Sequence, residues 1–277
     1  MNVVLIAVIS LGVIGLLSAL LLYGVSKRFA VYEDPRITQI QEMLPGANCG
    51  ACGFPGCPGL AAELVAAESL DTLSCPVGGQ SLMDEISAIL GKTAGTAQAQ
   101  IAVLRCNGGC ENRSQTNLYD GVASCAIASG LYGGSTTCSY GCFGMSDCIK
   151  VCPFDALSMN AETLLPEVDE NKCTACGKCV KACPKGLLEL RKKGLKNRRI
   201  YVSCMNKDKP AATAKSCKVG CIACKKCFKE CPFEAIRIEN NLAVIDDNLC
   251  RLCRKCVSVC PVNAIVECGF PPKKEVQ

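Results

Sequence analysis

Three cysteine runs with identical spacing occupy the C-terminal half of the chain. "CTACGKCVKACP" (173–184), "CIACKKCFKECP" (221–232) and "CRLCRKCVSVCP" (250–261) all follow C-x2-C-x2-C-x3-C-P. Cysteines three residues apart crowd their sulfurs into one loop, so they are poorly placed to cross-link distant strands as a disulfide scaffold does. The same crowding lets several thiolates converge on one metal centre. The runs therefore predict metal ligation.

The spacing favours iron–sulfur cubes over zinc. Paired C-x2-C motifs can also form four-cysteine zinc sites. In the longer run, however, three cysteines hold one [4Fe–4S] cube and the fourth holds a neighbouring cube. The proline after the fourth cysteine fixes φ and biases that cysteine toward extended backbone. Haem is disfavoured because the chain has no histidine and therefore no C-x-x-C-H.

The last two runs predict one ferredoxin module that binds two cubes with crossed ligands. One cube is expected on Cys221, Cys224, Cys227 and Cys260, and the other on Cys250, Cys253, Cys256 and Cys231. The run at 173 needs an upstream partner, which the irregular stretch "CSYGCFGMSDCIKVCP" (138–153) supplies. The same crossing predicts cubes on Cys138, Cys142, Cys148 and Cys183, and on Cys173, Cys176, Cys179 and Cys152.

The residues around these cysteines repeat as well. "CPFDAL", "CPFEAI" and "CPVNAI" begin at 152, 231 and 260, and each predicts a short helix or strand after the fourth cysteine. "LPEVDENKC" and "LAVIDDNLC" predict short strands that lead into the next cluster loop. The chain therefore contains an internal repeat of ferredoxin halves.

A different cluster motif precedes the ferredoxin runs. "NCGACGFPGC" (48–57) followed by "LSCPVGG" gives C-x2-C-x4-C-x17-C, a complete set for one cube without exchange. Its ligands are Cys49, Cys52, Cys57 and Cys75. The interspersed glycines allow the backbone to approach a cluster closely, so that N–H groups can bond to its sulfurs. "PGLAAELVAAESLD" (58–71) predicts a helix behind this site.

These sets use twenty of the 26 cysteines and predict at least five cubes. A sixth cube could draw on cysteines that flank the first ferredoxin module: Cys106, Cys110, Cys125, Cys204 and Cys217. The other interpretation is that each is a buried thiol, which behaves as a small apolar residue. Cys268, near the end of the chain, is expected to be free.

Residues 3–24 contain no charge and predict a transmembrane anchor. As a helix they would extend about 33 Å, enough to cross a hydrocarbon core of about 30 Å. A signal peptide is disfavoured because the apolar run is long and no basic segment precedes it. A buried core helix would need a larger apolar partner than the chain offers. Lys27 and Arg28 follow, so the positive-inside rule places the remainder in the reducing cytoplasm, where structural disulfides are rare.

The predicted fold class is α+β: one N-terminal transmembrane helix, a small helical Fe–S cluster domain and two tandem bacterial-type 2[4Fe–4S] ferredoxin modules. The expected boundaries are an anchor (1–26), the membrane-proximal cluster domain (27–92), a linker with a possible extra cluster segment (93–137), the first module (138–190), a connector (191–220) and the second module (221–277). "SLMDEISAILGK" (81–92) predicts a helix. "TAGTAQAQ" (93–100) is either a flexible hinge or a rigid connector.

The anchor, "CGACGFPGC" with its distant cysteine, and "CSYGCFGMSDC" together resemble the B subunit of the Rnf complex, an ion-translocating ferredoxin:NAD oxidoreductase of bacterial membranes. The resemblance covers nearly the whole chain, which matches a long form because it adds a second ferredoxin module. It implies an electron relay from soluble ferredoxin to flavin- and NAD-binding partner subunits, in a complex that exports Na+ or H+. It also implies a single-pass protein of the bacterial inner membrane.

Other functions remain open. "GLYGG" (130–134) lacks the strand, spacing and downstream acid of a dinucleotide site, so the NAD site is expected on another protein of the complex. No nucleic-acid partner is expected. A membrane-tethered polyferredoxin of a hydrogenase or formate dehydrogenase would not need the "CGACGFPGC" domain. A non-enzymatic iron–sulfur or zinc sensor would not need so many ligands.

The last module has a basic rim that suggests a docking site for acidic ferredoxin. It comprises Lys225, Lys226, Arg251, Arg254 and Lys255, with Lys215, Lys218 and Lys229 nearby. The loop at 173 carries only Lys178 and Lys181. Two alternatives are a solvated basic face and a set of cations that raises the potential of a cube.

Overall fold

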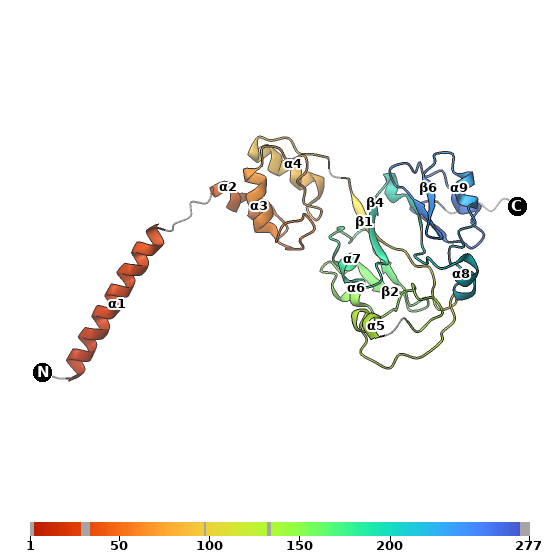
Figure 1. The fold of residues 1–277 in the computed structure, drawn as a ribbon. Helices are drawn as coiled ribbons and strands as arrows, with labels where there is room; N and C mark the ends of the chain where they lie inside the picture. Colours follow the sequence, from red (N-terminus) through yellow and green to blue (C-terminus); the bar gives the residue numbers. More distant parts are fainter. Residues whose placement is uncertain (1–2, 29–33, 97, 132–133, 272–277) are drawn as a thin grey trace.

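The computed structural model describes residues 3–28, 34–96, 98–131 and 134–271 of the 277-residue chain. Figure 1 shows three parts in chain order: a long N-terminal helix, a small helical domain and a larger body of short strands and helices.

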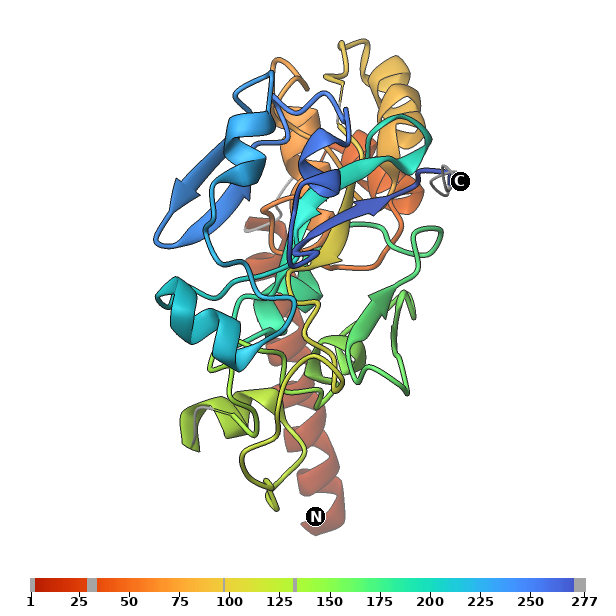
Figure 2. The same cartoon turned by 90° about the vertical axis from the view of Figure 1, so that its right-hand side faces the viewer.

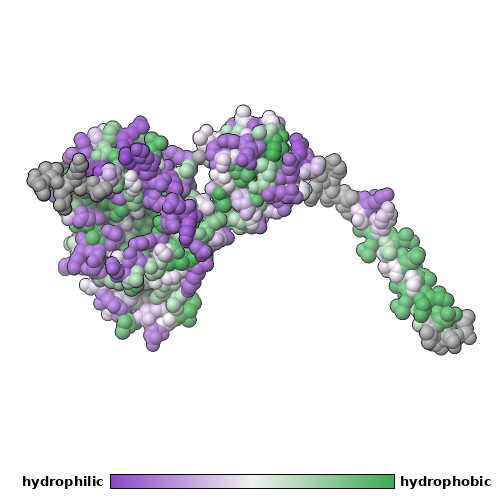
Figure 3. All heavy atoms as spheres, turned by 180° about the vertical axis from the view of Figure 1, so that it is seen from behind, coloured by the Kyte–Doolittle hydropathy of each residue, from purple (hydrophilic) through white to green (hydrophobic). Residues whose placement is uncertain are grey.

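Helix α1 (Val3–Arg28) is apolar and stands apart from the rest of the protein. Its large side chains are exposed, as for Leu11 at 71% and Leu21 at 68%, and Figure 3 shows an apolar surface along most of its length. Leu5–Arg28 is long and apolar enough to cross a membrane, at about 36 Å for its 24 residues. Within the described residues it is the one such candidate.

The small domain consists of α2 (Pro35–Met43), α3 (Cys57–Ala66) and α4 (Gly79–Leu90). Asp34 caps α2 by accepting a hydrogen bond from the Arg36 N–H at 2.9 Å, and Pro35 occupies the first helical turn. The helices bury one apolar core that includes Ile40, Leu60, Leu64, Met83 and Ile86. The helices predicted over 58–71 and 81–92 are thereby confirmed, with slightly different ends.

The larger body contains four antiparallel strand pairs. In residues 100–192, here called the first unit, β1 (Gln100–Leu104) pairs with β4 (Leu188–Lys192), and β2 (Leu157–Met159) pairs with β3 (Pro166–Val168). In residues 199–268, the second unit, β5 (Arg199–Val202) pairs with β8 (Ile265–Cys268), and β6 (Ile236–Glu239) pairs with β7 (Leu242–Ile245). Each unit therefore joins its first and last strands around an inner hairpin. β1 and β5, from segments expected to be linker and connector, belong to these sheets.

Short helices connect the strands. Four of them carry the third cysteine of a cluster run: α6 (Asp147–Lys150), α7 (Lys178–Ala182), α9 (Lys226–Glu230) and α10 (Lys255–Ser258). The others are α5 (Cys125–Leu131), η1 (Leu195–Asn197) and α8 (Pro210–Ser216).

The two units pack against each other through their outer strands, which meet in the middle of the body in Figure 2. Ile101 and Val103 of the first unit share a buried cluster with Tyr201 of the second. Arg105, which is 7% exposed, donates to the carbonyl oxygens of Val202 (3.2 Å) and Cys204 (3.3 Å). These buried contacts fasten the units together.

The first part of the segment that joins the small domain to the first unit packs against the small domain, at Lys92 and Gly95. The Lys92 ammonium donates to three carbonyl oxygens at the end of α3: Leu64 (2.9 Å), Val65 (2.8 Å) and Ala67 (2.5 Å). A cation stabilises these otherwise unpaired carbonyls. Gly95 lies so close to the small domain that an added Cβ would sit 2.4 Å from the Asp71 carbonyl oxygen.

Candidate iron–sulfur sites

The four cluster loops share one backbone shape. In the three regular runs, the residues before and after the second cysteine both have positive φ. These are Ala175 (56°) and Gly177 (72°), Ala223 (49°) and Lys225 (63°), and Leu252 (57°) and Arg254 (65°). The irregular run has the same pattern at Gly144 (75°) and Ser146 (65°), which flank Met145. Cys142 therefore takes the position of the first cysteine, and Met145 takes the position of the second.

The second unit brings together the two crossed sets expected from its sequence. One cavity is lined by Cys221, Cys224, Cys227 and Cys260. Another is lined by Cys231, Cys250, Cys253 and Cys256. The fourth cysteine of each run thus crosses to the other run's site.

The first unit keeps one expected set and alters the other. Burial raises the pKa of the Cys179 thiol, and Cys173, Cys176 and Cys152, the other members of one expected set, lie near enough for their charges to raise it further. A cavity in this unit is lined by Cys125, Cys142, Cys148 and Cys183. Cys125 thus stands where Cys138 was expected.

Helix α5 carries Cys125 to this cavity because its start docks on α6. Asp147 accepts hydrogen bonds from the Ser124 hydroxyl (2.8 Å) and the Ala126 N–H (3.1 Å). The Lys150 ammonium donates to the Ala123 carbonyl at 3.1 Å. These bonds place the Cys125 side chain beside the loop whose second cysteine is missing.

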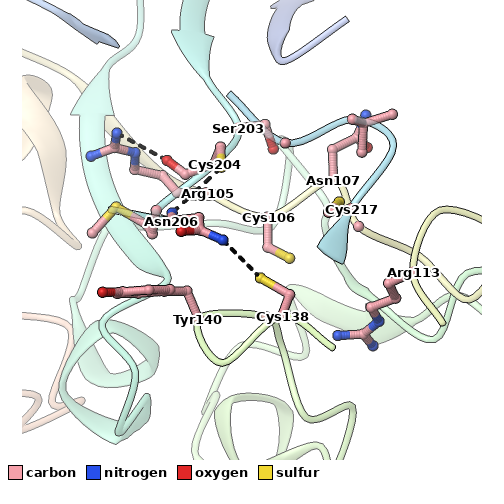
Figure 4. Close-up of a pocket in the computed structure, with 15 residues that line it drawn as sticks. Arg105, Cys106, Asn107, Arg113, Cys138, Tyr140, Ser203, Cys204, Asn206 and Cys217 are labelled. Atoms are coloured by element: carbon pink, nitrogen blue, oxygen red, sulfur yellow. Dashed lines mark hydrogen bonds between the residues drawn. The ribbon is translucent and has the colours of Figure 1, made fainter. Parts of the chain in front are cut away.

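Cys138 lines a separate cavity together with Cys106, Cys204 and Cys217, as Figure 4 shows. The remaining two cysteines lie outside the sets. Cys110 is exposed and contacts the Thr163 carbonyl oxygen at 3.6 Å, and Cys268 lies beside Tyr201 and Arg199.

Backbone N–H groups point at the fourth cysteine of several runs. The N–H groups of Ala156, Leu187 and Ala264 donate to the Sγ atoms of Cys152 (3.4 Å), Cys183 (3.3 Å) and Cys260 (3.3 Å), each four residues earlier. Such bonds stabilise a thiolate more than a thiol. The repeated segments after each fourth cysteine, such as "CPFDAL" and "CPVNAI", supply these donors and then form strands.

Burial raises the pKa of several of these thiols far above neutrality. The pKa of Cys142 and of Cys148 rises to about 12, and that of Cys256 also rises to about 12, in each case chiefly because burial penalises the charged form. A bound cation is needed to displace those protons, so cluster assembly releases protons. In the described residues, no group of three or more His, Cys, Asp or Glu side chains is placed to hold a single metal ion.

The membrane-proximal set lies between α3 and α4. Cys75 is electrostatically coupled to Cys57 and Cys49, and its Sγ accepts a hydrogen bond from the Gly78 N–H at 3.4 Å. The Asn48 side chain holds the loop by accepting from the Cys57 N–H at 2.8 Å. Gly56, at φ 108°, leaves room for that amide, because a Cβ there would lie 2.8 Å from Asn48 Oδ1.

Three family models match separate parts of the chain. Residues 44–77 match "Putative Fe-S cluster", residues 165–188 match "4Fe-4S binding domain", and residues 220–265 match "4Fe-4S dicluster domain". The matches cover the membrane-proximal set, the last run of the first unit and both runs of the second unit.

Relatives extend the likeness over nearly the whole chain. The chain is 46% identical over 251 residues to the B subunit of the Na(+)-translocating ferredoxin:NAD(+) oxidoreductase complex of Acetobacterium woodii, covering 91% of this chain and 74% of that protein. The chain belongs to the family of Rnf B subunits. This confirms the resemblance found in the sequence.

Two further relatives support the same family. The B subunit of the proton-translocating ferredoxin:NAD(+) oxidoreductase complex of Clostridium ljungdahlii is 39% identical over 90% of this chain and 87% of its own length. The B subunit of an ion-translocating oxidoreductase complex of Methanosarcina acetivorans is 39% identical over 86% of this chain and 88% of its own length. The family of Rnf B subunits thus includes members named for different transported ions.

Proposed function

We propose that this chain is the electron-transfer subunit of a membrane-bound, ion-translocating ferredoxin:NAD(+) oxidoreductase. Bound [4Fe–4S] cubes supply one-electron chemistry, and the protein's cysteines, N–H groups and buried side chains hold and tune them. The observation that carries the proposal is the series of four-cysteine sites on a chain of this family. NAD reduction and ion transport belong to partner subunits.

The proposed ligands of three cubes follow the cavities, and those of two others follow the cysteine spacing. Two cubes lie in the second unit, on the crossed sets given above, and one in the small domain, on Cys49, Cys52, Cys57 and Cys75. In the first unit, one cube lies on Cys173, Cys176, Cys179 and Cys152. The other lies on Cys125, Cys142, Cys148 and Cys183. The two units are then tandem 2[4Fe–4S] ferredoxin modules, and the first takes one ligand from its long insertion.

Helix α1 anchors the chain, and the remainder faces the cytoplasm. Lys27 and Arg28 end this helix, and cationic residues favour the cytoplasmic side of a bacterial membrane. Since a single helix cannot enclose an ion path, α1 is a tether and a contact for membrane partners. The small domain, next along the chain, passes electrons to those partners.

Soluble ferredoxin docks on the second unit. Lys225, Lys226, Arg251 and Lys255 are all exposed beside its cluster loops. An acidic ferredoxin would be steered to such a rim, and salt would slow the encounter. Arg254 contributes less, because its guanidinium pairs with Glu267 (2.5 Å) and lies over the Phe270 ring.

The test removes one ligand of the membrane-proximal cube. Membranes carrying Cys57→Ala should lose ferredoxin-driven NAD(+) reduction, whereas ferredoxin should still bleach the iron–sulfur absorbance of the two units. Cys110→Ala, an exposed cysteine outside every set, is the matched control and should keep full activity. Normal NAD(+) reduction by the Cys57 variant would remove this cube from the route.

A further inference from the structure

We propose a sixth [4Fe–4S] cluster, held by Cys106, Cys138, Cys204 and Cys217 at the joint between the two units. The presence of this cluster follows from the geometry of the cavity. Its role as a bridge for electrons rests on the proposed function.

The cavity has the form of the other cluster sites. It shares with three other cavities of the two units a lining that contains four cysteines. Cys138, Cys204 and Cys217 are each at most 9% exposed. Figure 4 shows all four cysteines around one space, with Asn206 directed at Cys138. The lining is mostly apolar, but it also holds Asn107, Asn206 and Arg113, which a core that only packs thiols as small hydrophobic groups would not need.

The four cysteines occupy equivalent positions in the two units. Cys106 and Cys204 each lie two residues beyond the first strand of their unit, β1 and β5. Cys138 lies four residues before Cys142, and Cys217 lies four residues before Cys221, in "CSYGC" and "CKVGC". Cys142 and Cys221 each open the first cluster loop of their unit.

The local turns match as well. The Gly141 N–H donates to the Cys138 carbonyl at 3.1 Å, and the Gly220 N–H donates to the Cys217 carbonyl at 3.2 Å. Each unit therefore contributes the same pair of ligands from the same local structure. A chance gathering of spare cysteines would not follow the internal repeat.

The sulfurs are surrounded by hydrogen-bond donors. Cys204 Sγ accepts from the backbone N–H groups of Asn206 and Cys221, both at 3.4 Å. The Asn206 side chain, 1% exposed, donates from Nδ2 to Cys138 Sγ at 3.6 Å. A fully buried amide aimed at a buried sulfur is the environment of a ligated thiolate.

Two cations lie between this cavity and the Cys142 site. The Arg113 guanidinium donates to the Cys142 carbonyl at 2.5 Å and is electrostatically coupled to Cys217 as well as Cys142. The Lys185 ammonium donates to the Ser139 carbonyl at 2.5 Å and is coupled to Cys138, Cys142 and Cys106. Positive charge here offsets the net negative charge of two neighbouring clusters with thiolate ligands.

The position makes this cluster a bridge. Cys221, a ligand of the second unit, donates its N–H to Cys204 Sγ, and Cys138 is four residues from Cys142, a ligand of the first unit. One electron passes from a reduced cube to an oxidised neighbour without forming or breaking a covalent bond. The sixth cluster would thus connect the two units into one conducting path.

The experiment counts clusters in the full chain, purified anaerobically in detergent, by native mass spectrometry with iron and sulfide analysis. Cys125→Ala and Cys138→Ala should each lose about four irons and four sulfides, and the double variant about eight, since each cysteine serves a different cube. If instead Cys125→Ala loses none and the double variant loses only what Cys138→Ala loses, Cys138 belongs to the first unit's cube and the proposal fails. Cys110→Ala and Cys268→Ala should keep all iron.

A milder variant decides the matter if Cys138→Ala fails to fold. Cys217→Ser preserves the size of the side chain, and circular dichroism checks its fold. Loss of about four irons, or an EPR signal from a three-iron cluster, supports the site. Full iron with an unchanged EPR spectrum overturns it. These readouts do not depend on NAD(+) reduction, so failure of the proposed function would appear separately, in the Cys57→Ala assay.

Discussion

The cluster loops at 142–152 and 221–231 form the same backbone from different residues. Both place positive φ on either side of the second ligand position and both start a short helix there, α6 in one and α9 in the other. One loop has a cysteine at that position and the other has Met145. Loop shape and ligand set are therefore specified separately.

The difference teaches where a missing ligand can come from. The regular loop places three cysteines of its own run in its cavity, and the fourth comes from the other run. The loop at 142 draws Cys125 from α5, which lies in an insertion between β1 and the run. This substitution also leaves Cys138 available for a second site. The insertion thus places a cysteine in the cavity that the loop at 142 lines.

The largest effect is expected when iron is removed, which tests whether these loops keep their backbone conformation without a cluster. Complete removal of iron and sulfide by a chelator should unfold residues 100–268 and leave α1 helical in detergent. Non-glycine residues with positive φ, such as Ala223 and Leu252, are held in an unfavourable conformation that costs about 1 kcal/mol each, and ligation supplies much of the folding energy. Circular dichroism and limited proteolysis measure the change. Protease resistance of the metal-free chain would show that the loops fold on their own.

The comparison is sharpest at Met145. Cys125→Ala should lose about four irons, and adding Met145→Cys should restore them, because the new sulfur occupies the second ligand position of an already suitable loop. Iron analysis and EPR of the full chain measure both steps. Met145→Ser on the same background is the matched control and should not rescue. If the variant with both Cys125→Ala and Met145→Cys still lacks about four irons, this loop differs from the regular loops in more than one side chain.

Much of this arrangement could be predicted from the sequence because cysteine spacing is a local signal. The crossed pairs of the second unit, the helices at 58–71 and 81–92 and the strands after each fourth cysteine all follow from short segments. The exchange of Cys125 for Cys138 depends on contacts across the fold, such as Ser124 and Ala126 binding Asp147. One signal was present: C-x2-M-x2-C-x3-C at 142 is the regular run with one substitution. The equivalent "CSYGC" and "CKVGC" segments also identify Cys138 and Cys217 as a pair.

A smaller effect is expected at the joint between the units. Arg191, 7% exposed, pairs with Glu189 (2.5 Å) and Asp247, so Arg191→Met leaves the half-buried Asp247 carboxylate without its cation and leaves Glu189 with Arg105 alone. Allowing for partial solvent screening, this should cost about 2 kcal/mol and lower the thermal midpoint by about 5 °C. Differential scanning calorimetry of the anaerobic protein measures it. Arg237→Met, which breaks only exposed pairs, should change the midpoint little; equal shifts would argue that the joint does not stabilise the units.

The smallest effect is expected from removing positive charge at the surface, and it should differ between the two units. Replacing Lys225, Lys226, Arg251 and Lys255 by Gln should slow the second-order reaction with an acidic ferredoxin about tenfold at low salt and flatten its salt dependence. Stopped-flow mixing measures the rate. Lys178→Gln with Lys181→Gln, in the first unit, is the control and should have little effect. An unchanged rate together with lowered cluster potentials would assign these cations to redox tuning instead of docking.

The packing of Lys92 and Gly95 against the small domain sets the length of a tether. Residues 96–98 are all that separate Gly95 from Ala99, whose carbonyl already accepts a hydrogen bond from the Lys193 N–H at 2.7 Å. The four backbone steps from Gly95 to Ala99 extend about 14 Å at most. Two bodies joined so closely meet at an effective concentration on the order of millimolar or higher, whatever the abundance of the protein. Electron exchange between them is therefore a first-order, intramolecular event, and dilution of the membrane would not slow it.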